Sequence, residues 1–247
     1  MRLIWIVGAS LMTVAAMLVA AGLVRTAPDR MRGRLLSGLV SYAVGTLMGA
    51  AFLALLPEAL RAGETVAMLG TVLAGLVLFF TLEKLILWRH CHDGTCDTHR
   101  ATGPLILTSD GLHNFVDGVV IAGAFLVSVP VGVATAVAVV AHELPQELGD
   151  IAVLLDSGYS FSRAVALNTV VSLSTPLGGI LAYAALDVVD GAVPYVLALA
   201  AAGFIYIAAA DLIPALHRRA ALTAGVSQVV LIVAGIGTIA VLEWVHP

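Results

Sequence analysis

Residues 3–24 read LIWIVGASLMTVAAMLVAAGLV, a run of 22 residues without a single charge. About 20 apolar residues cross the hydrocarbon core of a bilayer as an α-helix, so this run predicts a transmembrane helix. A cleaved signal peptide is the alternative. The run exceeds the usual apolar core of such a peptide, and only Arg2 precedes it. We therefore expect a retained helix.

Seven similar runs follow, and together they predict eight spans. Backbone groups in hydrocarbon must satisfy one another within the segment, so each span should be helical. The sequence thus predicts an all-α polytopic membrane protein with one transmembrane domain over residues 1–247. The expected spans are approximately 3–24, 35–57, 65–86, 104–128, 131–155, 164–186, 191–212 and 220–243. Their even spacing allows a 3+2+3 inverted-repeat arrangement.

The composition supports a membrane protein and argues against other classes. Hydrophobic residues make up 60% of the 247 residues and charged residues only 11%, whereas a soluble domain carries about 25% charged residues. Lys and Arg are scattered, with no basic run interleaved with aromatics, so we expect no nucleic-acid partner. The lipid bilayer is the expected environment, and the chain is compatible with a homodimer.

The basic residues predict the orientation. With eight spans, the loops after the odd-numbered spans share one side of the membrane. That side carries ten of the twelve basic residues, and only Arg2 and Arg61 lie on the other. By the positive-inside rule, both termini lie outside and the odd-numbered loops are cytoplasmic. We expect an integral protein of the plasma (inner) membrane.

Ionisable residues concentrate in the fourth span. Asp110, His113 and Asp117 stand at i, i+3 and i+7, which places them on one stripe of a helix, with Asn114 beside them. Such groups are costly inside a membrane and usually mark a site or a pathway.

The fifth span carries a second polar set. His142 and Gln146 share a face at i, i+4, and Glu143, Glu147 and Asp150 form another stripe. Pro145 lacks an N–H, so we expect a kink and a freed carbonyl beside His142.

Two facing helices with these stripes would bring imidazole nitrogens, carboxylates and amide oxygens together. That mixture suits a borderline divalent cation better than an alkali ion. One His–Asp pair could merely join helices, but the two spans carry nine ionisable or amide side chains. We therefore predict a divalent-metal site.

The motifs His113-Asn114-Phe115-Val116-Asp117-Gly118 and His142-Glu143-Leu144-Pro145-Gln146-Glu147-Leu148-Gly149-Asp150 closely resemble helices 4 and 5 of the ZIP (Zrt-/Irt-like) metal transporters. Residues 49–59, 82–84 and 206–214 resemble that family's second, third and seventh helices, so the resemblance covers nearly the whole chain. It implies an eight-helix fold and transport of Zn²⁺, and often Fe²⁺, Mn²⁺ or Cd²⁺, into the cytoplasm. Zinc is then the transported substrate, and no organic cofactor is expected.

The resemblance also implies site residues. The family's primary metal site corresponds to His113, Asp117, His142 and Gln146, and part of an adjacent second site corresponds to Asn114, Asp117 and Glu143. Asp110, Glu147 and Asp150 are candidates for the pathway.

The chain departs from the family pattern in three respects. Gln146 stands where many relatives have His or Glu, and Thr175 stands where some have Glu. Ala50 and Ala54 replace Asp and His of the second helix. We expect weaker binding, one well-occupied ion rather than two, and tighter zinc binding after Gln146→His.

The loop 88–103 between the third and fourth spans is rich in possible zinc ligands: His90, Cys91, His92, Cys96 and His99. The alternative is a plain polar linker. Replacing these residues should lower the zinc stoichiometry while leaving transport largely intact.

Other functions remain as alternatives. A metal exporter or a proton-coupled cation exchanger would share the same site. His142-Glu143 begins like the His-Glu-x-x-His of zinc proteases, but Gln146 replaces the second His. We therefore expect no enzymatic activity.

Overall fold

The computed structural model describes residues 1–26, 28–90, 98–186, 189, 191–217 and 222–245. Within these ranges every regular element is helical, and no strand occurs. Eight helical stretches are long and apolar enough to cross a membrane. The predicted all-α membrane fold with eight spans is therefore confirmed.

The eight spans contain thirteen helical elements, because three spans are divided. In chain order these are α1 (Arg2–Thr26), α2 (Asp29–Gly49), η1 (Ala50–Leu55), α3 (Leu56–Ala62), α4 (Thr65–His90), α5 (Thr98–Val127), α6 (Val129–Asp156), α7 (Phe161–Ser172), α8 (Ser174–Leu186), α9 (Ala192–Tyr206), η2 (Ile207–Leu212), α10 (Ile213–His217) and α11 (Leu222–Val245).

Two spans contain a π-helical turn directly before a proline. Pro57 is the second residue of α3, after η1, and Pro214 is the second residue of α10, after η2. A proline has no N–H to donate, and a wider turn accommodates it without ending the span. The second span therefore continues to Ala62 and the seventh to His217. Sequence analysis placed their ends near residues 57 and 212.

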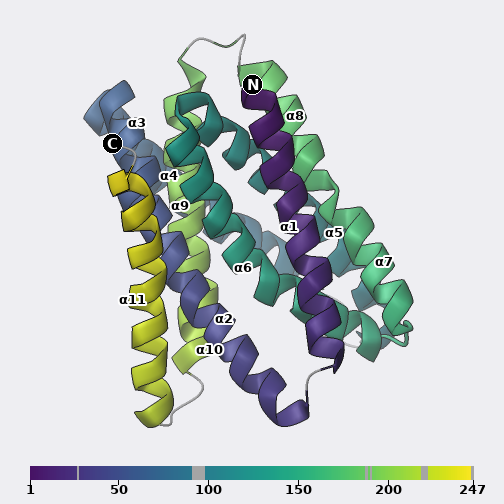
Figure 1. The fold of residues 1–247 in the computed structure, drawn as a ribbon. Helices are drawn as coiled ribbons and strands as arrows, with labels where there is room; N and C mark the ends of the chain where they lie inside the picture. Colours follow the sequence, from purple (N-terminus) through teal and green to yellow (C-terminus); the bar gives the residue numbers. More distant parts are fainter. Residues whose placement is uncertain (27, 91–97, 187–188, 190, 218–221, 246–247) are drawn as a thin grey trace.

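The central helix α5 packs against α1, α6, α7, α8 and α9, and its most extensive neighbour is α8 (Figure 1). Glycines allow this close approach. A methyl group at Gly118 would collide with the carbonyl oxygen of Thr175, and one at Gly178 with that of Phe115. Small residues let membrane helices approach closely, and this contact fixes the position of α5.

The contacts of the first three spans correspond to those of the last three spans. When the first three spans are exchanged with the last three, and α5 with α6, the packed pair α1–α6 becomes α8–α5, and α4–α9 becomes α11–α2. An inverted 3+2+3 arrangement would require this pairing, and η1 and η2 occupy equivalent places in it. We retain that arrangement as a proposal.

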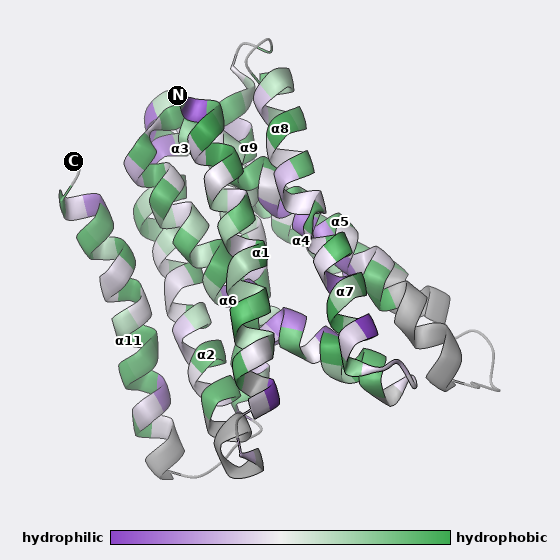
Figure 2. Ribbon diagram, turned by 45° about the vertical axis from the view of Figure 1, so that its right-hand side comes forward, coloured by the Kyte–Doolittle hydropathy of each residue, from purple (hydrophilic) through white to green (hydrophobic). Residues whose placement is uncertain are grey.

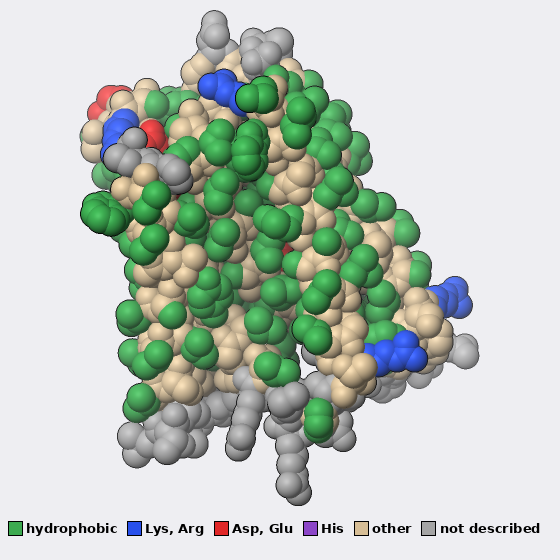
Figure 3. Space-filling view, in the orientation of Figure 1, with side chains coloured by type: hydrophobic (Ala, Val, Ile, Leu, Met, Phe, Trp, Pro, Cys, Tyr) green, Lys and Arg blue, Asp and Glu red, His purple; other side chains and the backbone are tan. Residues whose placement is uncertain are grey.

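The outer surface is largely hydrophobic, as contact with a lipid bilayer requires. Hydrophobic residues line most of α1 and α11 (Figure 2). On the face shown in Figure 3, hydrophobic side chains cover the middle of the molecule, and Lys and Arg side chains lie near its two ends. The beginning of α1 and the end of α11 lie at the same end of the bundle, as an even number of spans requires (Figure 1).

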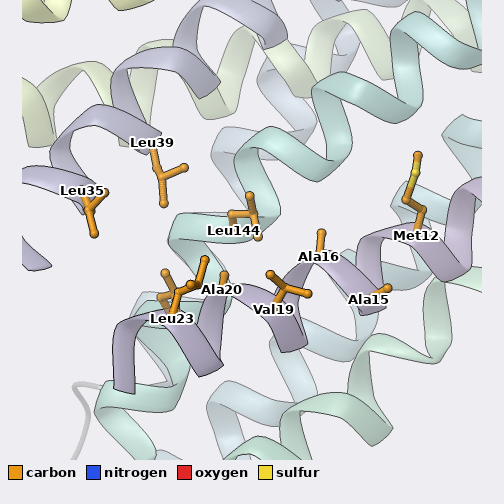
Figure 4. Close-up of a pocket in the computed structure, with 10 residues that line it drawn as sticks. Met12, Ala15, Ala16, Val19, Ala20, Leu23, Leu35, Leu39 and Leu144 are labelled. Carbon is orange, nitrogen blue, oxygen red and sulfur yellow. The ribbon is translucent and has the colours of Figure 1, made fainter. Parts of the chain in front are cut away.

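A hydrophobic cavity of about 450 Å³ lies between α1, α2 and α6. Its lining is entirely apolar, from Met12 and Val19 on α1 to Leu39 on α2 and Leu144 on α6 (Figure 4). Such walls offer no ligand to a dehydrated cation. The polar side chains of α6 lie outside this cavity.

Candidate metal site

Four potential ligands converge where α5 passes α6. They are His113 and Asp117 from α5, and His142 and Glu143 from α6. One ligand atom from each lies within 4.8 Å of all the others. The His113 and His142 Nε2 atoms are 3.2 Å apart. His142 Nε2 lies 3.2 Å from Asp117 Oδ2, and His113 Nε2 lies 3.3 Å from Glu143 Oε1.

Helix geometry explains how these side chains reach one place. His113 and Asp117 are four residues apart, so they lie one above the other on a single face of α5. His142 and Glu143 are consecutive and differ by about 100° around α6. They flank the line along which α6 faces α5, and both can therefore reach the same point.

The site is buried and rich in negative charge. His142 is 1% exposed, and Asp117 and Glu143 are 3% exposed. Asp117 Oδ2 and Glu143 Oε1 have no hydrogen-bond partner among the described residues, and the two imidazoles are their close neighbours. A buried, unsatisfied carboxylate is costly unless a positive charge joins it. The arrangement is thus suited to a cation.

A backbone contact orients one of the histidines. His142 Nδ1 lies 3.0 Å from the carbonyl oxygen of Ala138, one turn earlier on α6. A carbonyl only accepts, so Nδ1 carries the proton of the neutral ring, and Nε2 keeps its lone pair for the site. On the other side, the His142 ring lies 5.9 Å from that of Phe204 on α9. Pro145 lies one turn later, within a helix that continues to Asp156.

A small cavity of about 170 Å³ adjoins the site. His113 and Asp117 form part of its wall, and the other lining residues are mainly apolar side chains of α4, α5 and α9. The side chain of His113 is 26% exposed. The cavity therefore reaches the four-residue group from the His113 side.

Both predicted amide ligands donate a hydrogen bond to Asp110. The Gln146 Nε2 donates to Asp110 Oδ1 at 3.3 Å, and the Asn114 Nδ2 donates to the same oxygen at 3.0 Å. The Asn114 Oδ1 accepts from the Thr175 hydroxyl at 2.8 Å. Glu143 is the fourth member of the group of His, Asp and Glu side chains. A buried carboxylate such as Asp110 is a strong acceptor for amide N–H groups.

A second group of carboxylates adjoins the first. Asp110, Glu143 and Glu147 each place an oxygen within 4.8 Å of the others, so Glu143 belongs to both groups. Glu147 accepts from the Ser172 hydroxyl at 2.6 Å and from the Asn168 side-chain amide. Asp150 of α6, the third predicted pathway residue, is partly buried and outside both groups.

Sequence analysis missed Asn168 and Ser172 on α7. The sequence pattern could have identified them, because they are two polar residues four positions apart in a largely apolar span and so share one helix face. The predicted loop ligands fall outside the description: Cys91, His92 and Cys96 lie in the undescribed range 91–97, and the side chains of His90 and His99 are also undescribed.

The family model for "ZIP Zinc transporter" matches residues 89–243, more than half of the chain and including both helices of the candidate site, α5 and α6. The chain belongs to the ZIP family. This confirms the resemblance on which the site residues were predicted, and it makes the chain an integral membrane protein.

Several curated ZIP relatives match over most of the chain. The zinc transporter ZIP13 of Pongo abelii is 35% identical over 81% of this chain and 65% of its own length. The zinc transporter YKE4 of Saccharomyces cerevisiae is 30% identical over 75% and 62%. The zinc transporter zipt-7.2 of Caenorhabditis elegans is 28% identical over 83% and 57%. The matches thus span 57% to 65% of these relatives' own length.

Proposed function

We propose that this ZIP protein carries zinc and other divalent transition metals across a membrane, and that the ion binds between His113, Asp117, His142 and Glu143. The convergence of these four ligand atoms carries the proposal, since two buried carboxylate oxygens in it have no hydrogen-bond partner among the residues that the structure describes. The related proteins from Pongo abelii, Saccharomyces cerevisiae and Caenorhabditis elegans are all named zinc transporters.

The donor set suits a borderline divalent ion. Zinc is bound by imidazole nitrogen and carboxylate oxygen, commonly with four ligands. Two carboxylates supply a formal charge of −2, which balances one divalent cation. Fe²⁺, Mn²⁺ and Cd²⁺ accept the same ligands, so we propose them as further substrates.

The direction of transport is part of the same proposal. Ten of the twelve basic residues lie on one predicted side, which makes that side cytoplasmic by the positive-inside rule. We propose import into the cytoplasm across the plasma membrane. An exporter and a proton-coupled exchanger are the competing outcomes. For the proposed homodimer, α4 and α11 offer the most surface, since only 11% of their spanning windows is buried.

Radioactive zinc uptake into proteoliposomes of defined orientation tests this function. We expect zinc to accumulate when the face with the chain termini is outside, and Asp117→Asn to lower the initial rate at least about tenfold. Glu64→Gln makes the same charge change at a surface position and should transport normally. A pH gradient across the vesicle identifies proton coupling.

Two results would contradict the proposal. Uptake at the wild-type rate by Asp117→Asn, with the variant intact by size-exclusion chromatography, would remove the site. Uptake only in the opposite orientation would reverse the direction and favour an exporter.

A further inference from the structure

The hydrophobic cavity between α1, α2 and α6 opens to the outer surface of the bundle. Both α1 and α2 pack closely against α6, whereas they make little contact with each other. The helix α6 therefore forms the floor of the cavity, between α1 and α2 as its two walls (Figure 4). On the α1 wall, Met12 is 51% exposed and Val19 is 62% exposed. Hydrocarbon from the bilayer can thus reach the cavity from the side.

The chemistry of the walls selects a hydrocarbon occupant. All ten lining residues are Ala, Val, Leu or Met. Walls of this kind give water no hydrogen-bond partner, and an unfilled gap loses the dispersion contacts of close packing. A flexible apolar chain supplies those contacts without needing any polar partner.

The cavity extends through only half of the membrane. The first span is Arg2–Leu23, so Met12 lies at its middle and Leu23 at its end. From Met12 to Leu23 the helix rises about 16 Å, which is close to half of a hydrocarbon core of about 30 Å. The α2 wall begins with Leu35, the first residue of the second span. A lipid chain from one leaflet fits this depth, whereas a helix from a second copy of the chain would need the full thickness.

Positive charge follows directly at the end of the cavity where α1 finishes and α2 starts (Figure 1). Residues 25–34 join the two wall helices, and they include a single acidic residue, Asp29, and four arginines: Arg25, Arg30, Arg32 and Arg34. A basic cluster next to a membrane span attracts anionic lipid head groups. The charge of this segment therefore complements a phospholipid that carries a net negative charge.

We propose that the cavity holds one acyl chain of an anionic phospholipid, whose phosphate lies beside the basic segment 25–34. The lipid packs against Leu144 and Leu148, on the side of α6 away from the polar residues that alternate with them, Glu143 and Glu147. The helix that carries half of the candidate metal site is thus supported from behind by lipid. This inference depends on the membrane location of the chain and is independent of the transported ion.

Native mass spectrometry of the purified full chain in detergent tests the proposal. The probes are phosphatidylglycerol, which has a net negative charge, and phosphatidylcholine with the same acyl chains, which has none. We expect one phosphatidylglycerol to remain bound per chain, with an affinity at least about tenfold above that of phosphatidylcholine.

A substitution inside the cavity tests the acyl-chain part. Ala20→Phe fills the space between the walls with an aromatic ring and should lower the affinity for phosphatidylglycerol at least about tenfold. Ala74→Phe is the matched control, because it makes the same change at an exposed position of α4 outside this cavity. It should bind phosphatidylglycerol as the wild type does. Size-exclusion chromatography checks that both variants are folded.

Charge variants test the head-group part and leave the cavity unaltered. Replacing Arg30, Arg32 and Arg34 together by Gln should remove most of the preference for phosphatidylglycerol over phosphatidylcholine. Arg2→Gln with Arg61→Gln is the control, since these positions lie at the opposite ends of the first and second spans. This pair should keep the preference.

Four results would overturn the proposal. They are equal affinity of the wild type for the two lipids, unchanged lipid binding by folded Ala20→Phe, an equal loss of preference in the two sets of arginine variants, and a dimer that Ala20→Phe dissociates. The last result would assign the cavity to a second copy of the chain.

Discussion

Glu143 is the residue that belongs to both groups of potential metal ligands. Its carboxylate lies 3.3 Å from His113 Nε2, and it also belongs to the group with Asp110 and Glu147. Gln146 occupies the family's usual ligand position, yet its amide N–H donates to Asp110. The geometry therefore favours Glu143 as a fourth ligand, and the amide oxygen of Gln146 stays a prediction from the family resemblance.

Two variants distinguish these assignments. Glu143→Gln removes a charged ligand and should weaken zinc binding at least about tenfold. Gln146→Ala should change the dissociation constant little, since four ligands remain. Isothermal calorimetry measures both, in a chain carrying Cys91→Ser and Cys96→Ser so that the loop adds no thiolate. A larger effect from Gln146→Ala would restore the amide as the fourth ligand.

The packing of α5 on α8 is the contact between elements that positions the site. Gly118 lies directly after Asp117, and a side chain at this position would meet the Thr175 carbonyl. The distance between the two helices therefore depends on having no side chain there.

Gly118→Ala should separate α5 from α8 and destabilise the protein by roughly 1–3 kcal/mol, as overpacking does. Zinc uptake should fall as well, because Asp117 moves with the backbone. Gly8→Ala is the control, since nothing lies within 4 Å of a methyl group there. Unfolding in mixed detergent micelles measures both. Equal stability of the two variants would show that α5 and α8 can adjust.

The start of α4 is stabilised by a carboxylate outside the membrane spans. Glu64 accepts from the backbone N–H groups of Val66 and Ala67 at 3.1 and 2.7 Å. These two hydrogen bonds stabilise the ionised form and hold the pKa of Glu64 below its ordinary value.

This lowered pKa gives a pH-dependent effect. A carboxylate with a lower pKa in the folded state adds stability above its unfolded pKa of about 4.3, and that stability is lost as the pH falls through the folded pKa. At pH 7, Glu64→Gln should therefore melt below the wild type, and the difference should shrink in acid. Circular dichroism melts across this range measure it. A difference that does not change with pH would show that the charge of Glu64 plays no part.

The orientation is a property of the whole molecule. The predicted cytoplasmic side holds ten of the twelve basic residues, and the chain has only two cysteines, Cys91 and Cys96, both in the loop 88–103. They are natural reporters of that loop's side.

A membrane-impermeant maleimide should label Cys91 and Cys96 only after the cells are permeabilised. In a chain with both changed to Ser, Ala62→Cys lies at the end of the second span, on the predicted outer side, and should react in intact cells. Mass spectrometry or a gel shift measures the labelling. Labelling of Cys91 and Cys96 in intact cells would invert the topology and the direction of transport inferred from it.

The sequence alone determined the number of spans, their helical nature and the two helices that carry the polar residues. These follow from local properties, because a bilayer requires long apolar helices and tolerates ionisable groups only where they serve a purpose. Periodicity also placed His113 and Asp117 on one face.

Only the tertiary structure decided which atoms meet. It placed Glu143 with the histidines, placed Asn114 and Gln146 on Asp110, and supplied Glu147 with donors from α7. Periodicity fixes an angle around one helix axis, but not the distance and rotation between two helices. Those depend on contacts such as that of Gly118 with Thr175, between residues far apart in the chain.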